Sequence, residues 1–420
     1  MKSFCQGSGF IAVFLTLLAC RSSEDDRFPA LYSLLDQKNF FQAQMLYQTY
    51  QDELSGTERD FTEAILDNAF NRIEASQGRI DELLNKDLPD SLRQVLYDLN
   101  RDNAIKLYNY RGAKAAVDTL LSRYQNILTD EDVSDYQNDR ALWAALEGTP
   151  PQTVTINERT DLPMAKDRAG LSTLTVSAQG DSLNFIFDTG ANLSTTSQTV
   201  ARQLGMKLIP ASIAVGSITG NKVSAALAVC EQLTLGNISL QHVVFLVMPD
   251  EALLVEPIDY QIYGILGFPV IEALGEVQIT QDGHFVVPQQ ASAFAGDANL
   301  AMDGLTPLIC LEGKPFTFDT GANTTVLYQA FYQERQEAFD AQYPPDTISF
   351  AGAGGAISRD GYVIKHTFDV SGRPVTLPEV QLLKEKVKPE ETVYGNIGQD
   401  IISQFDTMTL NFDEMFIQFK

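Results

Sequence analysis

The sequence has few of the residues that many hydrolases use to bind a metal ion or to activate a nucleophile. It contains four cysteines and three histidines, and the histidines are scattered singly as His242, His284 and His366. No His-Glu-x-x-His, Gly-x-Ser-x-Gly or phosphate-loop motif occurs, and no metal-ligand spacing is present. We therefore expect no metal and no cofactor, and catalysis, if present, has to use other side chains.

Basic residues are also scarce. The chain has 30 Lys and Arg against 55 Asp and Glu, which gives a net charge of −25. Such a chain is repelled by nucleic acid and by an anionic membrane surface, so neither is expected as a partner. A content of 44% hydrophobic and 20% charged residues excludes wholesale disorder, and 420 residues allow two or three domains.

The apolar run near the N-terminus, Ile11 to Ala19, is too short to cross a bilayer as a helix. It follows Lys2 and ends in Leu17-Leu18-Ala19-Cys20, which resembles the lipobox of bacterial lipoproteins. The resemblance implies a signal peptide over residues 1–20 and lipidation of Cys20. The protein would then be anchored in the cell envelope, on the periplasmic face or the cell surface. The alternative is an ordinary signal peptide that happens to contain a cysteine.

Two cysteines, Cys230 and Cys310, lie well beyond this segment. Each is in an apolar, strand-like run, which favours buried thiols. A disulfide between them is the alternative, because an envelope compartment would permit it.

Residues 21–148 show the periodicity of helices. Phe61, Ile65, Ala69 and Ile73, for example, recur on one helical face. We expect about six helices in three antiparallel hairpins. The predicted breaks lie at Asp36–Asn39, Ser55–Thr57, Ser76–Gly78, Leu88–Asp90 and Tyr110–Gly112.

The interval between Gly78 and Gly112 is 112 − 78 = 34 residues, the period of tetratricopeptide repeats. The helical region resembles such repeats, which often form concave surfaces for protein partners. We therefore expect a protein partner on this region. An irregular helical bundle is the alternative.

Gly148-Thr149-Pro150-Pro151 ends the helical pattern, and 149–160 is predicted to be a linker. Beyond it one phrase occurs twice. Phe187-Asp188-Thr189-Gly190-Ala191-Asn192 returns as Phe318-Asp319-Thr320-Gly321-Ala322-Asn323, and 319 − 188 = 131. Tyr263-Gly264-Ile265-Leu266-Gly267 and Tyr394-Gly395-Asn396-Ile397-Gly398 keep that offset, since 398 − 267 = 131. These landmarks predict a duplicated unit, with halves at 161–292 and 293–420.

Each half runs from a strand through Asp-Thr-Gly-Ala, a short helix, a glycine-rich hairpin and an apolar-apolar-Gly turn to closing strands. This order resembles the retropepsin-like aspartic proteases. It covers residues 161–420, or 420 − 161 + 1 = 260 residues. The resemblance implies a single-chain form with two tandem all-β lobes behind the helical region, where the retroviral enzymes use two identical chains.

The resemblance makes Asp188 and Asp319 the catalytic pair of an endopeptidase whose substrate is a polypeptide. Two carboxyls about 3 Å apart share one proton. The ionised carboxyl then takes a proton from water while the other donates to the scissile carbonyl oxygen.

The neighbouring residues carry supporting roles in the family. The threonines hold the two loops together, and the glycines of the loops let backbone N–H groups point at the carboxylates. A glycine after each pair of apolar residues packs the loop from beneath. By this resemblance the support comes from Thr189, Gly190, Thr320, Gly321, Gly267 and Gly398.

Ala191 and Ala322 stand where pepsin-like enzymes commonly have a hydroxyl residue. The hydrogen bond of that hydroxyl to the carboxylate is missing, so the pKa values of the pair should be higher. We therefore expect activity at mildly acidic or neutral pH rather than at strongly acid pH.

Two glycine-rich hairpin tips resemble the flaps that close over a bound peptide and pair with its backbone. Mobile surface loops are the alternative. The candidates are Gly216, Ser217 and Ile218 in the first half, and Gly352, Ala353 and Gly354 in the second.

Two functions follow from this reading. The first is an aspartic endopeptidase attached to a membrane. The second is an inactive protease fold that, together with the helical repeats, binds a peptide or a partner. Retention of both Asp, both Thr and both Gly of the two loops favours the enzyme.

Overall fold

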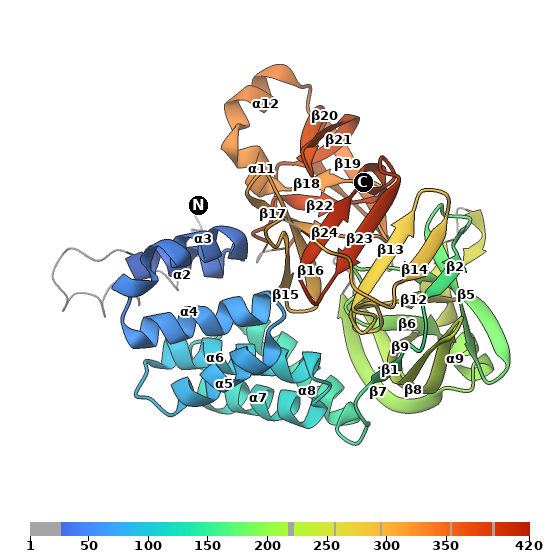
Figure 1. Cartoon of the computed structure of the whole chain (residues 1–420), viewed down its shortest axis with the longest axis horizontal. Helices are drawn as coiled ribbons and strands as arrows, with labels where there is room; N and C mark the ends of the chain where they lie inside the picture. Colours follow the sequence, from blue (N-terminus) through green and yellow to red (C-terminus); the bar gives the residue numbers. More distant parts are fainter. Residues whose placement is uncertain (1–26, 217–221, 256–257, 295, 353–354, 389–390) are drawn as a thin grey trace, which may run out of the picture.

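The computed structural model describes residues 27–216, 222–255, 258–294, 296–352, 355–388 and 391–420. A helical region over 27–146 is followed by two β-rich lobes, which confirms the predicted fold class. In Figure 1 the helices, coloured blue to cyan, occupy one side of the molecule, and the green-to-yellow and orange-to-red lobes occupy the other. The proposed signal peptide and Cys20 lie outside the described residues.

The helical region contains seven α-helices within the described residues. Helix α3 begins after Asn39, whose side chain accepts the N–H of Gln42, and α4 begins with a capping box formed by Ser55 and Glu58. The helices are α2 (Arg27–Asp36), α3 (Phe40–Tyr50), α4 (Gly56–Ala69), α5 (Ile73–Leu84), α6 (Asp90–Lys106), α7 (Tyr110–Arg123) and α8 (Asp130–Leu146).

Helices α2 and α3, α4 and α5, and α6 and α7 pack as three successive pairs, and α8 adds a seventh helix on α7. Two of the predicted breaks are wrong. Gly78 lies inside α5 and Gly112 in the first turn of α7, where the Asn109 side chain accepts its N–H. The chain turns earlier, at Asn71 and Tyr108, which both have positive φ. The assignment to tetratricopeptide repeats stays a prediction.

The first lobe is built on one large sheet, in which the described strands run in the order β1-β9-β6-β12-β5-β4-β8-β7. Strand β1 lies within the predicted linker and pairs with β9, so this segment is part of the lobe. The described elements are β1 (Thr153–Thr155), β2 (Thr160–Pro163), β3 (Ala165–Lys166), β4 (Ser172–Ala178), β5 (Asp181–Phe187), β6 (Ser194–Ser197), α9 (Gln198–Gln203), β7 (Lys207–Gly216), β8 (Lys222–Leu235), β9 (Ile238–Met248), η3 (Asp250–Leu253), β10 (Leu254–Val255), β11 (Tyr260–Gln261), β12 (Gly264–Leu266), α10 (Phe268–Glu272), β13 (Glu276–Thr280) and β14 (His284–Val287).

The second lobe repeats the central pairings of the first. Strand β17 is parallel to β22 as β5 is to β12, and β22 is antiparallel to β18 as β12 is to β6. Its described elements are β15 (Leu300–Asp303), β16 (Thr306–Leu311), β17 (Lys314–Phe318), β18 (Val326–Leu327), α11 (Gln329–Glu334), α12 (Gln336–Gln342), β19 (Asp346–Gly352), β20 (Gly355–Val370), β21 (Arg373–Leu383), β22 (Gly395–Ile397), α13 (Gln399–Ile402), β23 (Thr407–Asn411) and β24 (Phe416–Phe419).

A separate sheet joins the two lobes, with the order β2-β14-β13-β23-β24. The yellow strands β13 and β14 lie beside the red strands β23 and β24 in Figure 1. At the centre of the β13–β23 pairing, Gln278 faces Thr409, and 409 − 278 = 131. The residue at the middle of the junction therefore pairs with its own counterpart in the repeat, as a pseudo-twofold axis requires.

The helical region packs against both lobes. One buried cluster contains helix residues such as Phe61 together with Phe268 of the first lobe and Leu300 of the second. Polar contacts add to this interface: the Tyr108 hydroxyl donates to the Pro269 carbonyl at 3.1 Å. The helices and the lobes therefore share a continuous core.

Cys230 is buried and Cys310 is half-buried, and both are free thiols. The disulfide alternative is therefore wrong. In the described part of the chain, no helix has the length and apolar character needed to cross a membrane.

Candidate active site

Each lobe places one carboxyl group directly after a buried strand. Asp188 follows β5 directly, and Asp319 follows β17. The backbone N–H of Asp188 donates to the Leu266 carbonyl at 3.2 Å, and the N–H of Asp319 donates to the Ile397 carbonyl at 3.0 Å. The parallel pairing of β5 with β12 and of β17 with β22 thus fixes where each Asp-Thr-Gly loop begins.

The two loops are cross-linked by their threonines. The backbone N–H of Thr189 donates to Oγ1 of Thr320 at 3.0 Å, and the N–H of Thr320 donates to Oγ1 of Thr189 at 3.0 Å. Each hydroxyl then donates across the junction, Thr189 to the Phe318 carbonyl at 2.7 Å and Thr320 to the Phe187 carbonyl at 2.9 Å. Both side chains are at most 1% exposed. These four hydrogen bonds hold the loops against each other in the arrangement that the resemblance implies.

The glycines of the loops bring the two carboxyl groups together. Gly190 and Gly321 each donate a backbone N–H to the carboxylate of their own loop at 2.8 Å. A Cβ added at Gly190 would lie 2.7 Å from Cγ of Asp319, and one added at Gly321 would collide with the carboxyl group of Asp188. Each glycine therefore packs against the carboxyl group of the opposite lobe, and any side chain there would separate the pair.

The surroundings raise the pKa of both carboxyl groups. Burial between the lobes raises the pKa of Asp188 well above its usual range, and the neighbouring charge of Asp319 raises it further. Burial also raises the pKa of Asp319. Hydrogen bonds from Asp188, Gly321 and Asn396 oppose that rise. The pair therefore retains a proton at a higher pH than two isolated carboxyl groups would.

Gly267 and Gly398 lie directly beneath the loops. A Cβ at Gly267 would stand 2.5 Å from the Leu193 carbonyl carbon, and one at Gly398 would stand 2.8 Å from the Thr324 carbonyl. Their φ values are negative, so lack of space and not backbone conformation requires glycine here. The residues that follow them bind the loops, since Phe268 N–H donates to the Ala191 carbonyl and Gln399 N–H donates to the Ala322 carbonyl.

Asn396 is a site residue that sequence reasoning missed. Its side-chain Nδ2 donates to Oδ2 of Asp319 at 3.2 Å. The sequence does contain a sign of this role, because Asn396 breaks the repeat: 396 − 131 = 265, and residue 265 is Ile. The expected loss of a hydrogen bond at Ala322 is therefore offset at Asp319, whereas no such amide stands at the corresponding position of the first lobe.

The two predicted flaps correspond to hairpins. Gly216 ends β7 opposite Lys222 of β8, and Gly352 ends β19 opposite Gly355 of β20. Ser217, Ile218, Ala353 and Gly354 lie outside the described residues.

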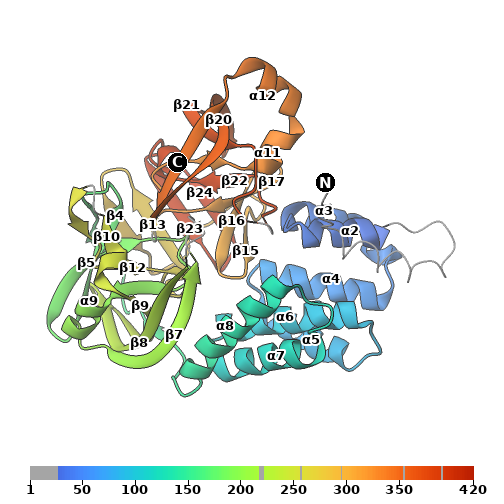
Figure 2. The ribbon, with the colours of Figure 1, turned by 180° about the vertical axis from the view of Figure 1, so that it is seen from behind.

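Different elements brace the two hairpins. Asn138 of α8 donates through Nδ2 to the Ala214 carbonyl of β7 at 3.0 Å, and its Oδ1 accepts the Ala214 N–H at 2.8 Å. Figure 2 shows α8 beside β7. In the second lobe, the Tyr362 hydroxyl of β20 donates to Asp340 of α12 at 2.6 Å. The helical region therefore contacts the β7–β8 hairpin of the first lobe, which carries the predicted flap.

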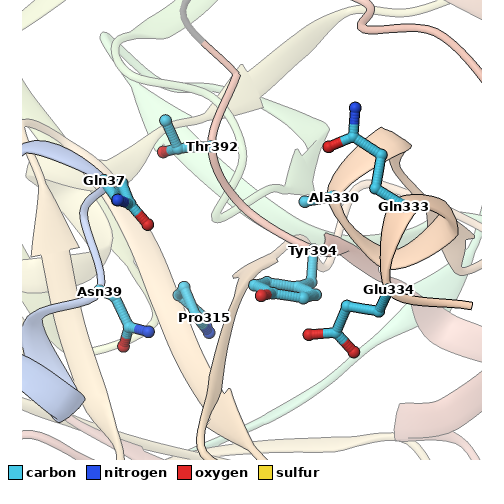
Figure 3. Close-up of a pocket in the computed structure, with 8 residues that line it drawn as sticks. All are labelled: Gln37, Asn39, Pro315, Ala330, Gln333, Glu334, Thr392 and Tyr394. Carbon is cyan, nitrogen blue, oxygen red and sulfur yellow. The ribbon is translucent and has the colours of Figure 1, made fainter. Parts of the chain in front are cut away.

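A hollow of about 360 Å³ lies between the helical region and the second lobe. Figure 3 shows Tyr394 and Pro315 between the turn after α2 and helix α11. Pro315 is near the start of β17, and Asp319 follows the opposite end of that strand, so the hollow does not include the carboxyl pair. It is lined by Gln37, Asn39, Pro315, Ala330, Gln333, Glu334, Thr392 and Tyr394. Among the described residues, no three His, Cys, Asp or Glu side chains gather where they could hold a metal ion.

Residues 174–270 match a family model described as aspartyl protease, a segment that contains Asp188 and Gly267. The curated proteins give no match to this sequence. Among solved structures, the crystal structure of Basic 7S globulin from soybean is similar at 11% identity, covering 63% of this chain and 94% of that chain with a TM-score of 0.39. The family match supports a protease-type function.

Proposed function

We propose that the protein is an aspartic endopeptidase in which Asp188 and Asp319 form one catalytic pair. The observation that carries this proposal is the mutual packing of the two loops. Each glycine lies against the carboxyl group of the opposite lobe, and the threonines cross-link the loops by four hydrogen bonds. A protein that only bound peptides would not require two carboxyl groups pressed together with raised pKa values.

The chemistry follows from one proton shared by two carboxyl groups. The ionised carboxyl takes a proton from water, and the water oxygen bonds to the scissile carbonyl carbon. The protonated carboxyl gives its proton to the carbonyl oxygen, which produces a neutral gem-diol. When the C–N bond breaks, the nitrogen takes the proton from the first carboxyl, and a gem-diol hydroxyl returns a proton to the second. The pair is then in its starting state.

The raised pKa values support activity at mildly acidic to neutral pH. The hairpins that carry Gly216 and Gly352 would cover an extended peptide, with its backbone paired as an added strand. We also propose that Cys20 carries a lipid anchor in the cell envelope, and that the helical region binds a protein partner or the substrate.

Digestion of a diverse peptide mixture between pH 3 and pH 8 tests the catalytic proposal. We expect the full chain to cleave peptides, and Asp188→Asn and Asp319→Asn each to reduce the rate by at least about a thousandfold, because each removes one proton-transfer partner. Asp181→Asn is the matched control, because Asp181 is exposed at the far end of the strand that leads to Asp188.

Cleavage that survives either substitution would refute the catalytic pair. Absence of cleavage by the correctly folded parent, checked by circular dichroism, would favour the inactive peptide-binding protein instead.

A further inference from the structure

The two carboxyl groups have different surroundings, although the repeat places them symmetrically. Next to Asp319 stand Asn396 on β22 and Thr317 on β17, which face each other across the parallel strands. Subtracting 131 gives Ile265 and Ile186, which face each other in the same way in the first lobe. The second lobe thus has a polar pair of side chains where the first lobe has an apolar pair.

Hydrogen bonds fix the orientation of the Asn396 amide. Oγ1 of Thr317 lies 2.5 Å from Oδ1 of Asn396 and can donate to it, because an amide oxygen only accepts. The Nδ2 group is then turned toward Oδ2 of Asp319, at 3.2 Å. Asn396 is 7% exposed, so water has little access to compete for this contact.

An amide N–H can donate to a carboxylate but cannot accept a proton from a carboxylic acid. The contact therefore favours the ionised form of Asp319 over its protonated form. Each carboxylate accepts the N–H of its own loop glycine, Gly190 for Asp188 and Gly321 for Asp319. Asp319 accepts the Asn396 amide in addition, and Asp188 has no counterpart of that donor, since the side chain at position 265 is a hydrocarbon.

We propose that Asn396 is a positioning residue that makes the pair unequal, holding Asp319 as the carboxylate and leaving the shared proton on Asp188. This inference rests on the proposed function. Asp319 then takes the proton from water, and Asp188 protonates the carbonyl oxygen. When the C–N bond breaks, Asp319 gives its proton to the nitrogen and a gem-diol hydroxyl returns a proton to Asp188, so that each cycle begins from the same state.

Among the described residues, few other titratable groups influence the pKa values of the pair. The largest influences on the pKa of each carboxyl are burial, the other carboxyl and the donors of the loops. Tyr328, whose hydroxyl is hydrogen-bonded to Thr317, is a titratable side chain near the pair. Burial raises its pKa most, followed by the charges of Glu391 and Asp319, so it stays neutral across the working range.

The test substitutes Asn396 by Leu, which keeps the size and removes the donor. Without that donor the monoanion of the pair is less stable. We therefore expect the acid limb of the pH profile of kcat/KM to move upward by about one pH unit. The alkaline limb should move little, because Asp319 is ionised on both sides of that transition. Thr317→Val, which only frees the amide to rotate, should move the acid limb in the same direction by less. An unchanged acid limb in Asn396→Leu, with its thermal midpoint retained, would overturn the proposal.

A second measurement needs no activity. With 13C-carboxyl-labelled aspartate and the double variant D188N/D319N as the reference spectrum, NMR can follow each remaining carboxyl. We expect Asp319 in Asp188→Asn to titrate at a lower pH than Asp188 in Asp319→Asn, and Asn396→Leu to remove most of that difference. Equal midpoints in the two single variants would refute the inequality. If the midpoints differ as expected but no peptide is cleaved, the proposed function fails and the inequality of the carboxyl groups stands.

Discussion

At the scale of single residues, the carboxyl pair carries a folding cost that depends on pH. The pKa of Asp188 is raised in the folded protein, mainly by burial and then by Asp319. A carboxyl group whose pKa is raised by folding makes its full contribution to folding stability below its unfolded pKa of about 3.9. That contribution is lost as the pH rises through the pKa of the folded protein. The site should therefore destabilise the fold most above the folded pKa values, where both carboxyl groups are ionised.

Asp188→Asn should remove the part of this pH dependence that Asp188 contributes, because the amide cannot ionise and has nearly the same shape. We expect its thermal midpoint to exceed that of the parent by about 2 °C at pH 8, with little difference at pH 4. Thermal melts at intervals of one pH unit provide the measurement, with Asp181→Asn as the control. Parallel pH dependence of parent and variant would show that Asp188 carries no such penalty.

At the scale of elements, the β7–β8 hairpin of the first lobe rests on the helical region, whereas the β19–β20 hairpin of the second lobe rests on its own α12. Asn138 makes two hydrogen bonds with the backbone of Ala214, near the end of β7. Apolar packing adds to this contact, since Trp143 and Leu146 of α8 share a buried cluster with Ile213 of β7. The position of the first hairpin is thus set by α8 as well as by its own lobe.

Asn138→Leu should loosen β7. Loss of two hydrogen bonds of about 1 kcal/mol each predicts amide exchange at least about tenfold faster in residues 207–216. Hydrogen exchange read by mass spectrometry measures this effect. Strands β19 and β20 serve as the internal control, because that hairpin is braced by Asp340 of α12 through Tyr362. Unchanged exchange in β7 would mean that the apolar packing alone holds the strand.

The order of elements was predictable because the repeat marks the same positions twice. The strands before Asp188 and Asp319 and the closing hairpins follow from alternation and from that offset. The breaks at Gly78 and Gly112 were not predictable, since tertiary packing and the cap at Asn109 override the weak helix propensity of glycine. The contact between Asn138 and Ala214 joins residues 76 positions apart in two different regions, so a local sequence pattern could not predict it.

At the scale of the whole molecule, the helices and both lobes behave as one packed body. The helical region contributes Phe61 and Leu96 to a cluster that also contains Phe268 and Leu300. Polar contacts at the interface involve the backbone as well, with Asn71 donating to the Phe412 carbonyl at 3.3 Å. A helical region attached in this way cannot unfold without exposing apolar surface of the lobes.

We therefore expect one cooperative unfolding transition in urea. Trp143, the single tryptophan, is 3% exposed in α8 and stacks on Tyr110, so its fluorescence reports the helical region. Hydrogen-exchange protection of β13 and β23 reports the junction of the lobes. The two probes should give the same midpoint. A change in Trp143 emission at distinctly lower urea would show that the helical region unfolds separately.

The pairing of β13 with β23 also has a consequence for the order of events during synthesis. Gln278 leaves the ribosome 131 residues before Thr409, its partner at the centre of the junction. Until then β13 has an unpaired edge and Asp188 faces no second carboxyl group. Contacts of such long sequence separation form late, so the first lobe has to wait for the second to emerge. The carboxyl pair is thus completed only after both lobes have been made. Under the proposed function, a nascent chain therefore has no formed site with which to cut itself or its neighbours.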